Sequence, residues 1–246
     1  SGTDVVGNNN ATLFGGGNYV EGKFERAFGF DGEDDYAYTP FKPDYFFDYN
    51  EGRFTLSCWV MPVPYNQPQS IMSIESQESD MLSWNWGIYL NSENHFIAKN
   101  DTPARTSASE RQDVLTSKTV ADANNWYFVA LVFNRTECEL YVNGEMEASG
   151  TTIVSVTGRP NVRIVNGRRV TRTPVPLKGG SVTLGRSVAS SKYRYYFRGL
   201  IDEAKLFKNA LNPAEIKILY TGAVPGVAAL PRPGFSAPPP GSATTE

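Results

Sequence analysis

Cysteine and histidine are almost absent from this sequence, which has two cysteines, Cys58 and Cys138, and one histidine, His95. These three isolated residues do not show the ligand spacing of a zinc site, so zinc is not expected. Each cysteine lies in an apolar run, where a free thiol is usually a small buried side chain. A disulfide is the alternative, and it requires the two strands to be neighbours with facing side chains.

Long apolar segments are also lacking. No run approaches the roughly 20 residues that a membrane helix needs, so membrane insertion is not expected. Hydrophobic residues still make up 40% of the chain, enough for a large core, and aromatics make up 13%. With 22 glycines and 16 prolines, this composition favours strands and turns over helices. The 246 residues are typical of one large all-β domain.

Carboxylates are missing from one long interval, between Glu147 and Asp202. The basic residues of that interval are Arg159, Arg163, Arg168, Arg169, Arg172, Lys178, Arg186, Lys192, Arg194 and Arg198. Residues 1–150 carry 9 basic and 22 acidic side chains, whereas residues 151–246 carry 14 and 4. Either the two parts interleave as surface pairs of little energetic worth, or the basic part presents a patch to an anionic partner.

Residues 159–172 are the most basic part of this interval, and they are expected to form a hairpin. Arg168 and Arg169 at its turn are candidate ligands for uronate, sialic acid or sulfate, because a guanidinium group can pair with two acceptor oxygens at once. An acidic protein surface would satisfy the same side chains. Self-association through residues 159–172 is therefore an open alternative.

Nucleic acid is not an expected partner. Residues 192–198 do alternate basic and aromatic side chains, as single-strand binding surfaces do. However, a pI near 5.4 disfavours a polyanion everywhere except at a local patch, and strand alternation alone produces the same pattern.

The two ends of the chain differ in composition. Residues 1–222 have the pattern of a folded domain, whereas residues 223–246 are rich in proline, glycine, alanine and serine. Such a segment cannot bury enough apolar surface to fold, so it is expected to be an extended linker or tail. A linker indicates one module of a longer polypeptide.

Apolar periodicity predicts several elements. Residues 126–133 are apolar almost throughout, which is typical of a central strand covered on both faces, and Asn143-Gly144 predicts the hairpin turn that follows the next strand. In residues 54–60, alternation places Phe54, Leu56, Cys58 and Val60 on the core face. Residues 197–207 read as a closing strand. A short helix then follows, with Asn212 as its cap, Pro213 in its first turn and Glu215 as the third-position acid.

The order of these segments, with residues 10–13, 27–32 and 35–38 as opening strands and residues 86–90 as a later strand, resembles the laminin G-like jelly roll of the concanavalin A-like lectin and glucanase superfamily. The resemblance implies a two-sheet antiparallel β-sandwich with one short C-terminal helix. It also implies glycan binding more often than glycan cleavage, although the same sandwich serves many functions.

The resemblance further implies a calcium ion that joins the opening strands to the closing one. Asp202, in the motif Gly-Leu-Ile-Asp-Glu, matches the family's side-chain ligand, and Asp31 or Asp34 would be its partner. Calcium takes six to eight oxygen ligands, so a glycine-rich acidic turn is a suitable source. The alternative is that Asp202 accepts backbone hydrogen bonds and that Asp31 shapes an Asx turn.

Carbohydrate recognition would need aromatic platforms beside hydrogen-bonding groups. The candidates are Trp84 and Trp86, with Asn85 and Tyr89 beside them. A second candidate is the loop that contains Asn100, Asp101 and Arg105. Tryptophan in all-β proteins is more often part of the core, and at least one of this pair is expected there, together with Trp126.

Catalysis is not expected. Retaining glycosidases of the resembled superfamily carry two Glu with an Asp between them on one strand face, and no such run occurs here. Glu75 and Glu78 come nearest, but they would lie on opposite strand faces. His95 has no recognisable partner set, and no phosphate loop, nucleophile elbow or dinucleotide fingerprint is present.

The sequence as a whole therefore predicts an extracellular, non-catalytic binding module for carbohydrate, in particular anionic glycan, within a larger adhesion or surface protein. The competing hypothesis is a structural module that assembles a surface layer, filament or virus-like particle through protein contacts.

Overall fold

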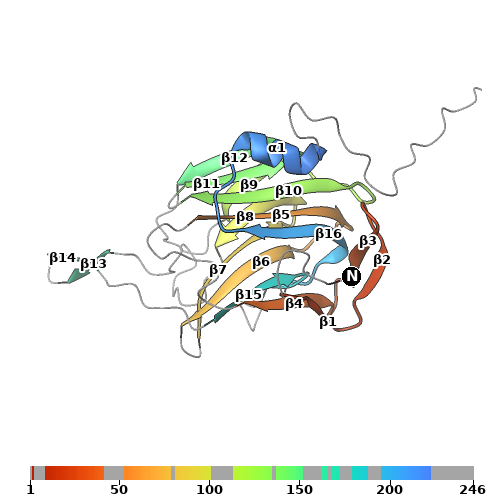
Figure 1. Cartoon of the computed structure of the whole chain (residues 1–246), viewed down its shortest axis with the longest axis horizontal. Coiled ribbons are helices and arrows are strands. Elements are labelled where there is room, and N and C mark those ends of the chain that lie inside the picture. The colour runs from red at the N-terminus through yellow and green to blue at the C-terminus, as the bar shows by residue number, and fades with distance from the viewer. Residues whose placement is uncertain are drawn as a thin grey trace, which may run out of the picture.

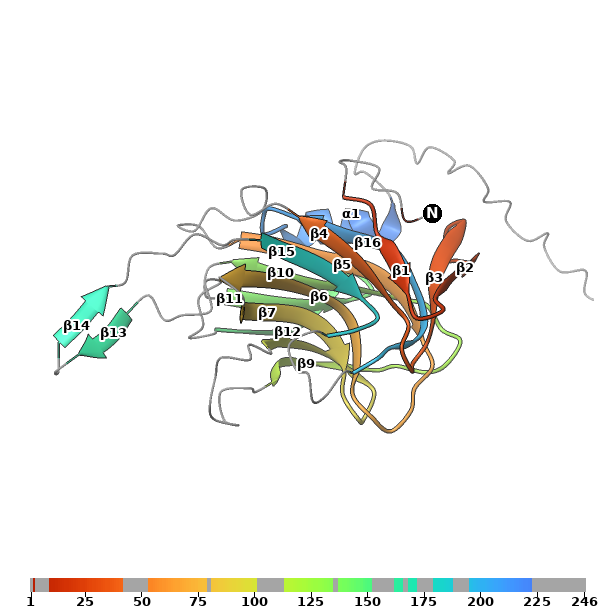
Figure 2. The same cartoon turned by 90° about the horizontal axis from the view of Figure 1, so that it is seen from below.

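Two antiparallel sheets of seven strands each face one another and enclose the core (Figures 1 and 2). The structure is a computed structural model and describes residues 2, 9–41, 53–78, 81–100, 113–134, 137–151, 162–165, 168–171, 179–187 and 195–222. This architecture confirms the predicted all-β sandwich of the concanavalin A-like jelly-roll type.

The two sheets are formed by segments that are distant in sequence. The first sheet has the order β1 (Thr12–Phe14), β4 (Tyr36–Phe41), β15 (Gly179–Leu184), β6 (Gln69–Glu78), β7 (Met81–Leu90), β8 (His95–Asn100) and β9 (Asp113–Val120). The second has the order β12 (Glu145–Thr151), β11 (Glu137–Val142), β10 (Tyr127–Asn134), β5 (Arg53–Pro62), β16 (Arg198–Phe207), β3 (Arg26–Asp31) and β2 (Asn18–Glu21).

A third, two-stranded sheet pairs β13 (Val162–Val165) with β14 (Arg168–Thr171) in antiparallel register. This hairpin is the one expected for residues 159–172. It belongs to neither large sheet, and Figures 1 and 2 both show it apart from the sandwich.

Helix α1 (Pro213–Thr221) begins as the sequence predicts. The Asn212 side chain accepts from the Glu215 amide, and the Glu215 carboxylate accepts from the Asn212 amide, which completes a capping box with Pro213 in the first turn. Gly222 ends the helix in the left-handed conformation with φ 68°. The predicted turn at Asn143 and Gly144 is also present, with φ of 52° and 79°.

The main core lies between the sheets and follows strand alternation. Phe54, Leu56, Cys58 and Val60 all point into it, as predicted. From the first sheet, Trp86 packs its ring 4.9 Å from that of Phe133. Burying side chains of this size contributes about 1.5–3 kcal/mol each, so this layer accounts for much of the stability of the fold.

A second apolar cluster covers the other side of the second sheet, where α1 lies (Figure 1). Trp59 and Phe128 come from the sheet, and Ile216 and Tyr220 come from α1. The Trp59 ring lies 5.6 Å from that of Tyr220 and 5.7 Å from that of Phe128. Strand β10 is thus covered on both faces, as its apolar run predicts, and Trp126 packs partly buried at the edge of this cluster.

Cys58 and Cys138 are separate buried thiols, so the disulfide alternative is wrong. Strand β10 lies between the strands that carry them, with Cys58 opposite Val129 and Cys138 opposite Phe133. Burial raises the pKa of both thiols to about 12, because a thiolate loses its hydration in the core.

Candidate functional site

The side of the first sheet that points away from the core carries a row of polar and aromatic side chains. This outer face of the first sheet is defined by register across β4, β15, β6, β7 and β8, and the row contains Tyr38, Thr183, Ser73, Gly87 and Lys99. Their neighbours along each strand point into the core, among them Ala37, Leu184, Met72, Trp86 and Ala98. At the usual strand spacing the row spans about 19 Å.

An aromatic and cationic stack lies beside this row, at the β1 edge. Phe14 on β1 is opposite Tyr36 on β4, and their rings stack with centroids 4.7 Å apart and an interplanar angle of 9°. The Arg186 guanidinium, just after β15, lies 3.7 Å from the centroid of the Tyr36 ring. Because β4 lies between β1 and β15, Tyr36 is enclosed by Phe14 on one side and Arg186 on the other. Phe14 is 42% exposed, so this Phe14–Tyr36–Arg186 stack is partly open to solvent at its Phe14 end.

Arg186 has no ionic partner in the described part of the chain. Ion pairs there join Lys205 to Glu203 and Lys217 to Glu145, and neither involves Arg186. Its Nε is buried and makes no hydrogen bond to any described residue. A cation on an aromatic face is attractive. Among the described residues, no carboxylate neutralises the positive charge of Arg186, and the guanidinium is held against the Tyr36 ring.

Lys99 is a second positively charged side chain on the outer face of the first sheet. Its Nζ lies 5.8 Å from the Tyr89 ring centroid and 5.5 Å from that of Tyr195. Gly87 makes this packing feasible, because a Cβ at this position would lie 2.9 Å from Cε2 of Tyr89 and 2.7 Å from the Met72 carbonyl oxygen. The face thus carries two separated cations, each against tyrosine rings.

Two hydroxyl groups on the first sheet, those of Ser70 on β6 and Thr183 on β15, are fully buried without a hydrogen bond to described residues. A buried polar group without a partner costs about 1–3 kcal/mol, so such groups are rare in native proteins and require an explanation. Together with Arg186 Nε, they are polar atoms that no described residue satisfies.

The turn between β3 and β4 brings three carboxylates together. Oxygen atoms of Asp31, Asp34 and Asp35 all lie within 4.8 Å of one another. The Asp31 amide donates to Asp35 Oδ2 at 3.0 Å, and the Glu33 amide donates to Asp31 Oδ1 at 2.8 Å, which is the Asx turn considered above. Burial raises the pKa of Asp35 above its ordinary value, and repulsion by Asp31 and Asp34 raises it further. Backbone hydrogen bonds from Asp31 and Gly16 act in the opposite direction and lower the pKa of Asp35, so the turn is a cluster of negative charges partly compensated by main-chain donors.

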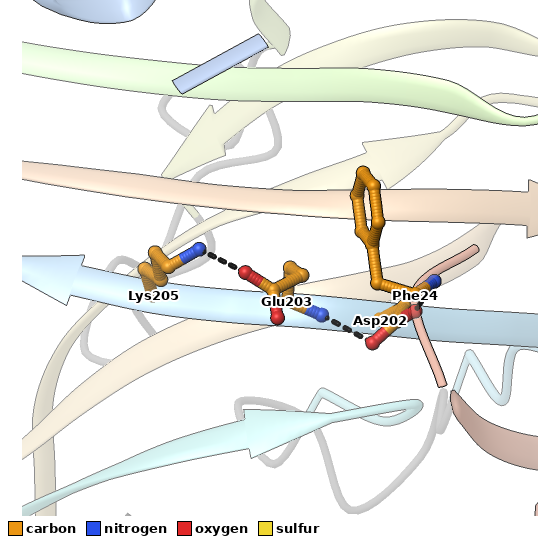
Figure 3. A network of polar contacts seen from close by, with 4 residues as sticks. All are labelled: Phe24, Asp202, Glu203 and Lys205. Atoms are coloured by element: carbon orange, nitrogen blue, oxygen red, sulfur yellow. Dashed lines mark hydrogen bonds and ion pairs between the residues drawn. The ribbon is translucent and has the colours of Figure 1, made fainter. Parts of the chain in front are cut away.

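Asp202 lies elsewhere and has a different role (Figure 3). Its Oδ2 accepts from the Phe24 amide at 2.8 Å, and its Oδ1 accepts from the Glu203 amide at 2.8 Å. The bond from Phe24 attaches the β2–β3 turn to the closing strand, while desolvation raises the pKa of Asp202 above its ordinary value. In register Asp31 is opposite Arg198, four residues before Asp202 and so about 13 Å away along the strand. The implied set of Asp31, Asp34 and Asp202 is therefore not one calcium site.

The predicted sugar platforms need correction where the structure describes them. Trp86 is 0% exposed, because its strand phase points it into the core against Phe133, and it cannot offer a ring face to a ligand. Tyr89 does lie on the outer face, but it is 1% exposed because it packs over Gly87 and beneath Lys99. The remaining predicted side chains lie outside the residues whose side chains are described: Trp84, Asn85, Asn100, Asp101, Arg105, Arg168 and Arg169.

The residues that form the candidate site have weak signals in the sequence. Tyr36 and Tyr38 alternate around Ala37, which places both rings on the face opposite the core once the strand is recognised. Arg186 is one of ten cations in the carboxylate-free interval, and no pattern separates it from the other nine. Phe14 belongs to a three-residue strand whose pairing with β4 is visible only in the structure.

Comparison with family models gives the class of the protein. Residues 31–217 match the family described as the concanavalin A-like lectin/glucanases superfamily, so the chain belongs to this superfamily. Comparison with curated proteins finds no match.

Solved structures with the same fold include several glycan-related proteins. Domain 4 of an extracellular arabinanase from Geobacillus stearothermophilus, in complex with arabinotriose, is 19% identical with a TM-score of 0.60, over 89% of this chain and 92% of that one. The binding domain of botulinum neurotoxin DC, in complex with SialylT, is 14% identical with a TM-score of 0.55, over 87% and 47%. Trypanosoma rangeli sialidase is 16% identical with a TM-score of 0.54, over 86% and 29%. At these identities the likeness shows the fold alone.

In the described residues, no helix has the length and apolar character that crossing a membrane requires.

Proposed function

We propose that this chain is a non-catalytic carbohydrate-binding module that binds anionic glycans at the Phe14–Tyr36–Arg186 stack. The observation that carries the proposal is Arg186, a partly exposed cation with a buried, unpartnered Nε and no carboxylate beside it among the described residues. Carboxylate and sulfate groups fit a planar guanidinium because two of their oxygens accept parallel hydrogen bonds.

The stack also offers an apolar surface for the uncharged part of a sugar ring. The exposed face of Phe14 offers an apolar surface on which the C–H face of a pyranose packs, as aromatic rings do in sugar sites. Its centroid and the Arg186 guanidinium are no more than 8.4 Å apart, the sum of their distances to the Tyr36 ring. One oligosaccharide therefore reaches both groups. Lys99, farther along the face, offers a second charge to the next acidic units of a polymer.

Two further lines support a binding module. The arabinanase domain that shares the fold is seen with arabinotriose, and the neurotoxin binding domain is seen with SialylT. The sequence contains no Glu-x-Asp-x-Glu run, and the one histidine points its Nδ1 at the Ser117 carbonyl oxygen at 2.9 Å. A surface or extracellular location accompanies this proposal, since polymers with uronate or sulfate groups are found there.

The test is a glycan array followed by titration calorimetry, with polygalacturonate, heparin, sialyllactose and neutral arabinan as ligands. We expect acidic ligands to bind and arabinan to bind more weakly. Arg186→Gln should weaken binding at least about 10-fold, because charged hydrogen bonds contribute about 1.5–3 kcal/mol. The matched control is Arg26→Gln: Arg26 also lies over a tyrosine, 5.6 Å from the Tyr19 centroid, but on the second sheet.

The competing function, assembly through protein contacts, has one observation in its favour. Hairpin β13–β14 belongs to neither large sheet and carries three arginines in eight residues of strand. Light scattering across a salt series separates the two functions. Salt-sensitive self-association without glycan binding would replace the carbohydrate proposal with assembly, whereas a monomer that binds acidic glycans would support it.

A further inference from the structure

We propose that the ligand on the outer face of the first sheet is an internal segment of a polyanionic polysaccharide, with one acidic group at Arg186 and a later one at Lys99. The inference rests on the proposed function and narrows it from acidic glycans in general to polymers that carry acidic groups on successive units. A glycan with a single terminal acidic group would contact only one of the two cations.

The sheet holds the two cations apart. The Arg186 guanidinium lies 3.7 Å from the ring centroid of Tyr36 on β4, whereas Lys99 Nζ lies 5.8 Å from that of Tyr89 on β7. Strands β15 and β6 lie between β4 and β7, so the strands that carry the two tyrosines are about 14 Å apart at the usual spacing. A disaccharide is too short to contact both cations, but a chain of several sugar units is long enough.

Lys99 is restrained by two aromatic rings. Besides the Tyr89 ring, the Tyr195 ring lies with its centroid 5.5 Å from Lys99 Nζ. The Tyr195 carbonyl oxygen accepts from the Ser70 amide at 3.0 Å, which attaches the segment before β16 to β6, one of the strands between the two cations. A long side chain that is already ordered loses less rotamer freedom when a ligand binds. Lys99 is therefore positioned in advance for a second acidic group.

The row between the two cations adds no charge. Thr183 and Ser73 are uncharged and 0% exposed, so a ligand would contact the half-buried side chains of Arg186 and Lys99 rather than these two residues. Asp113 is in register with Lys99 but belongs to β9, beyond the end of this row. Two positive charges at the ends of an uncharged stretch fit an anionic group that is repeated along a chain, and not one compact anion.

The experiment is titration calorimetry of the whole chain with galacturonate oligomers of two and six units, heparin oligosaccharides of the same lengths, and sialyllactose. The galacturonate hexamer should bind at least about 10-fold more tightly than the dimer, because the second charged contact becomes intramolecular. The heparin series shows whether sulfate replaces carboxylate. Lys99→Gln should reduce the hexamer-to-dimer ratio to the small statistical advantage of a longer chain, whereas Arg186→Gln should weaken binding of both lengths.

The matched control is Lys23→Gln, because Lys23 also lies over an aromatic ring, 4.7 Å from the Trp59 centroid, but beside the second sheet. A ratio that is retained in Lys23→Gln and lost in Lys99→Gln supports the inference. Equal affinity for dimer and hexamer, an unchanged ratio in Lys99→Gln, or sialyllactose binding as tight as that of the hexamer would overturn it. These results leave the proposed function standing, whereas the absence of binding to every acidic ligand would contradict the proposed function itself.

Discussion

The outer faces of the two sheets are built from the same strand alternation but have opposite chemistry. On the second sheet, Trp59 and Phe128 are covered by Ile216 and Tyr220 of α1, and the cluster is apolar. On the first sheet, the equivalent positions carry Tyr36, Thr183 and Lys99, and Arg186 lies beside them. One face therefore contributes to stability, whereas the other retains polar atoms and charges that the described protein does not use.

Each outer face carries a buried serine hydroxyl without a partner among the described residues, Ser57 on the second sheet and Ser70 on the first, but the faces differ in how a buried threonine is satisfied. Thr55 on the second sheet is fully buried, yet its hydroxyl donates to the Asn209 carbonyl oxygen at 2.8 Å and accepts from the Leu211 amide at 3.0 Å. Thr183 on the first sheet is equally buried and has no such partner among described residues. Buried polar atoms without partners are rare in native proteins, so the hydroxyl of Thr183 makes a smaller contribution to stability than that of Thr55.

The largest effect is expected from Trp59→Ala. This substitution removes the centre of the apolar cluster under α1 and should lower the free energy of unfolding by about 3–5 kcal/mol. Urea denaturation followed by fluorescence measures it. At temperatures where the variant stays folded, glycan binding should be unchanged. If binding is lost from a folded variant, the two faces are not separate in function.

A smaller loss is expected from Asp202→Ala. Removing this carboxylate leaves the amides of Phe24 and Glu203 without their acceptor and should cost about 1–3 kcal/mol (Figure 3). Thermal unfolding of the variant and the parent, under the same buffer conditions, measures the effect. An unchanged melting temperature would contradict a structural role for the Asp202 carboxylate at the β2–β3 turn.

The two buried threonines should respond in opposite directions to the same substitution. Thr55→Val removes two hydrogen bonds and should destabilise the fold by about 1–2 kcal/mol. Thr183→Val replaces an unpartnered hydroxyl with a methyl group and should be neutral or stabilising, by up to about 1 kcal/mol. Matched denaturation curves measure both. Equal destabilisation would show that the Thr183 hydroxyl has a partner.

The smallest effect concerns the two thiols. With a pKa near 12, Cys58 and Cys138 stay protonated and should not react with a thiol reagent at pH 8 until the protein unfolds. Because the folded pKa exceeds the ordinary value of 9.0, unfolding becomes easier as pH rises above about 9. Below that pH the thiols contribute no pH dependence. Rapid labelling of the native chain at pH 8 would contradict the burial.

Much of the fold was predictable from the sequence because its signals are local. The alternation in residues 54–60, the apolar run of β10, the turn at Asn143 and the cap at Asn212 each depend on neighbouring residues. The acidic turn was partly predictable for the same reason. Asp31 and Asp34 are close in sequence, and they do lie together, with Asp35 as a third member.

The candidate site on the outer face of the first sheet was harder to predict, because it depends on which strands are neighbours. Phe14, Tyr36 and Arg186 are separated by up to 172 positions and meet only because β4 pairs with both β1 and β15. Trp86 was misassigned because a tryptophan suits a sugar platform and a core equally well. The two roles are distinguished by the side of the sheet on which the residue lies, and Trp86 lies on the side that faces the core.

The most direct test of the proposed binding site compares two of the three large apolar side chains that are exposed among the described residues, Phe14 at 42% exposure on the first sheet and Met146 at 52% on the second. Titration calorimetry with the acidic glycan selected on the array should be run on Phe14→Ala and Met146→Ala. We predict at least about a 10-fold loss of affinity for Phe14→Ala, as expected for losing an aromatic contact with a ligand, and none for Met146→Ala. Unchanged affinity in Phe14→Ala, or an equal loss in both variants, would contradict a ligand site on the outer face of the first sheet.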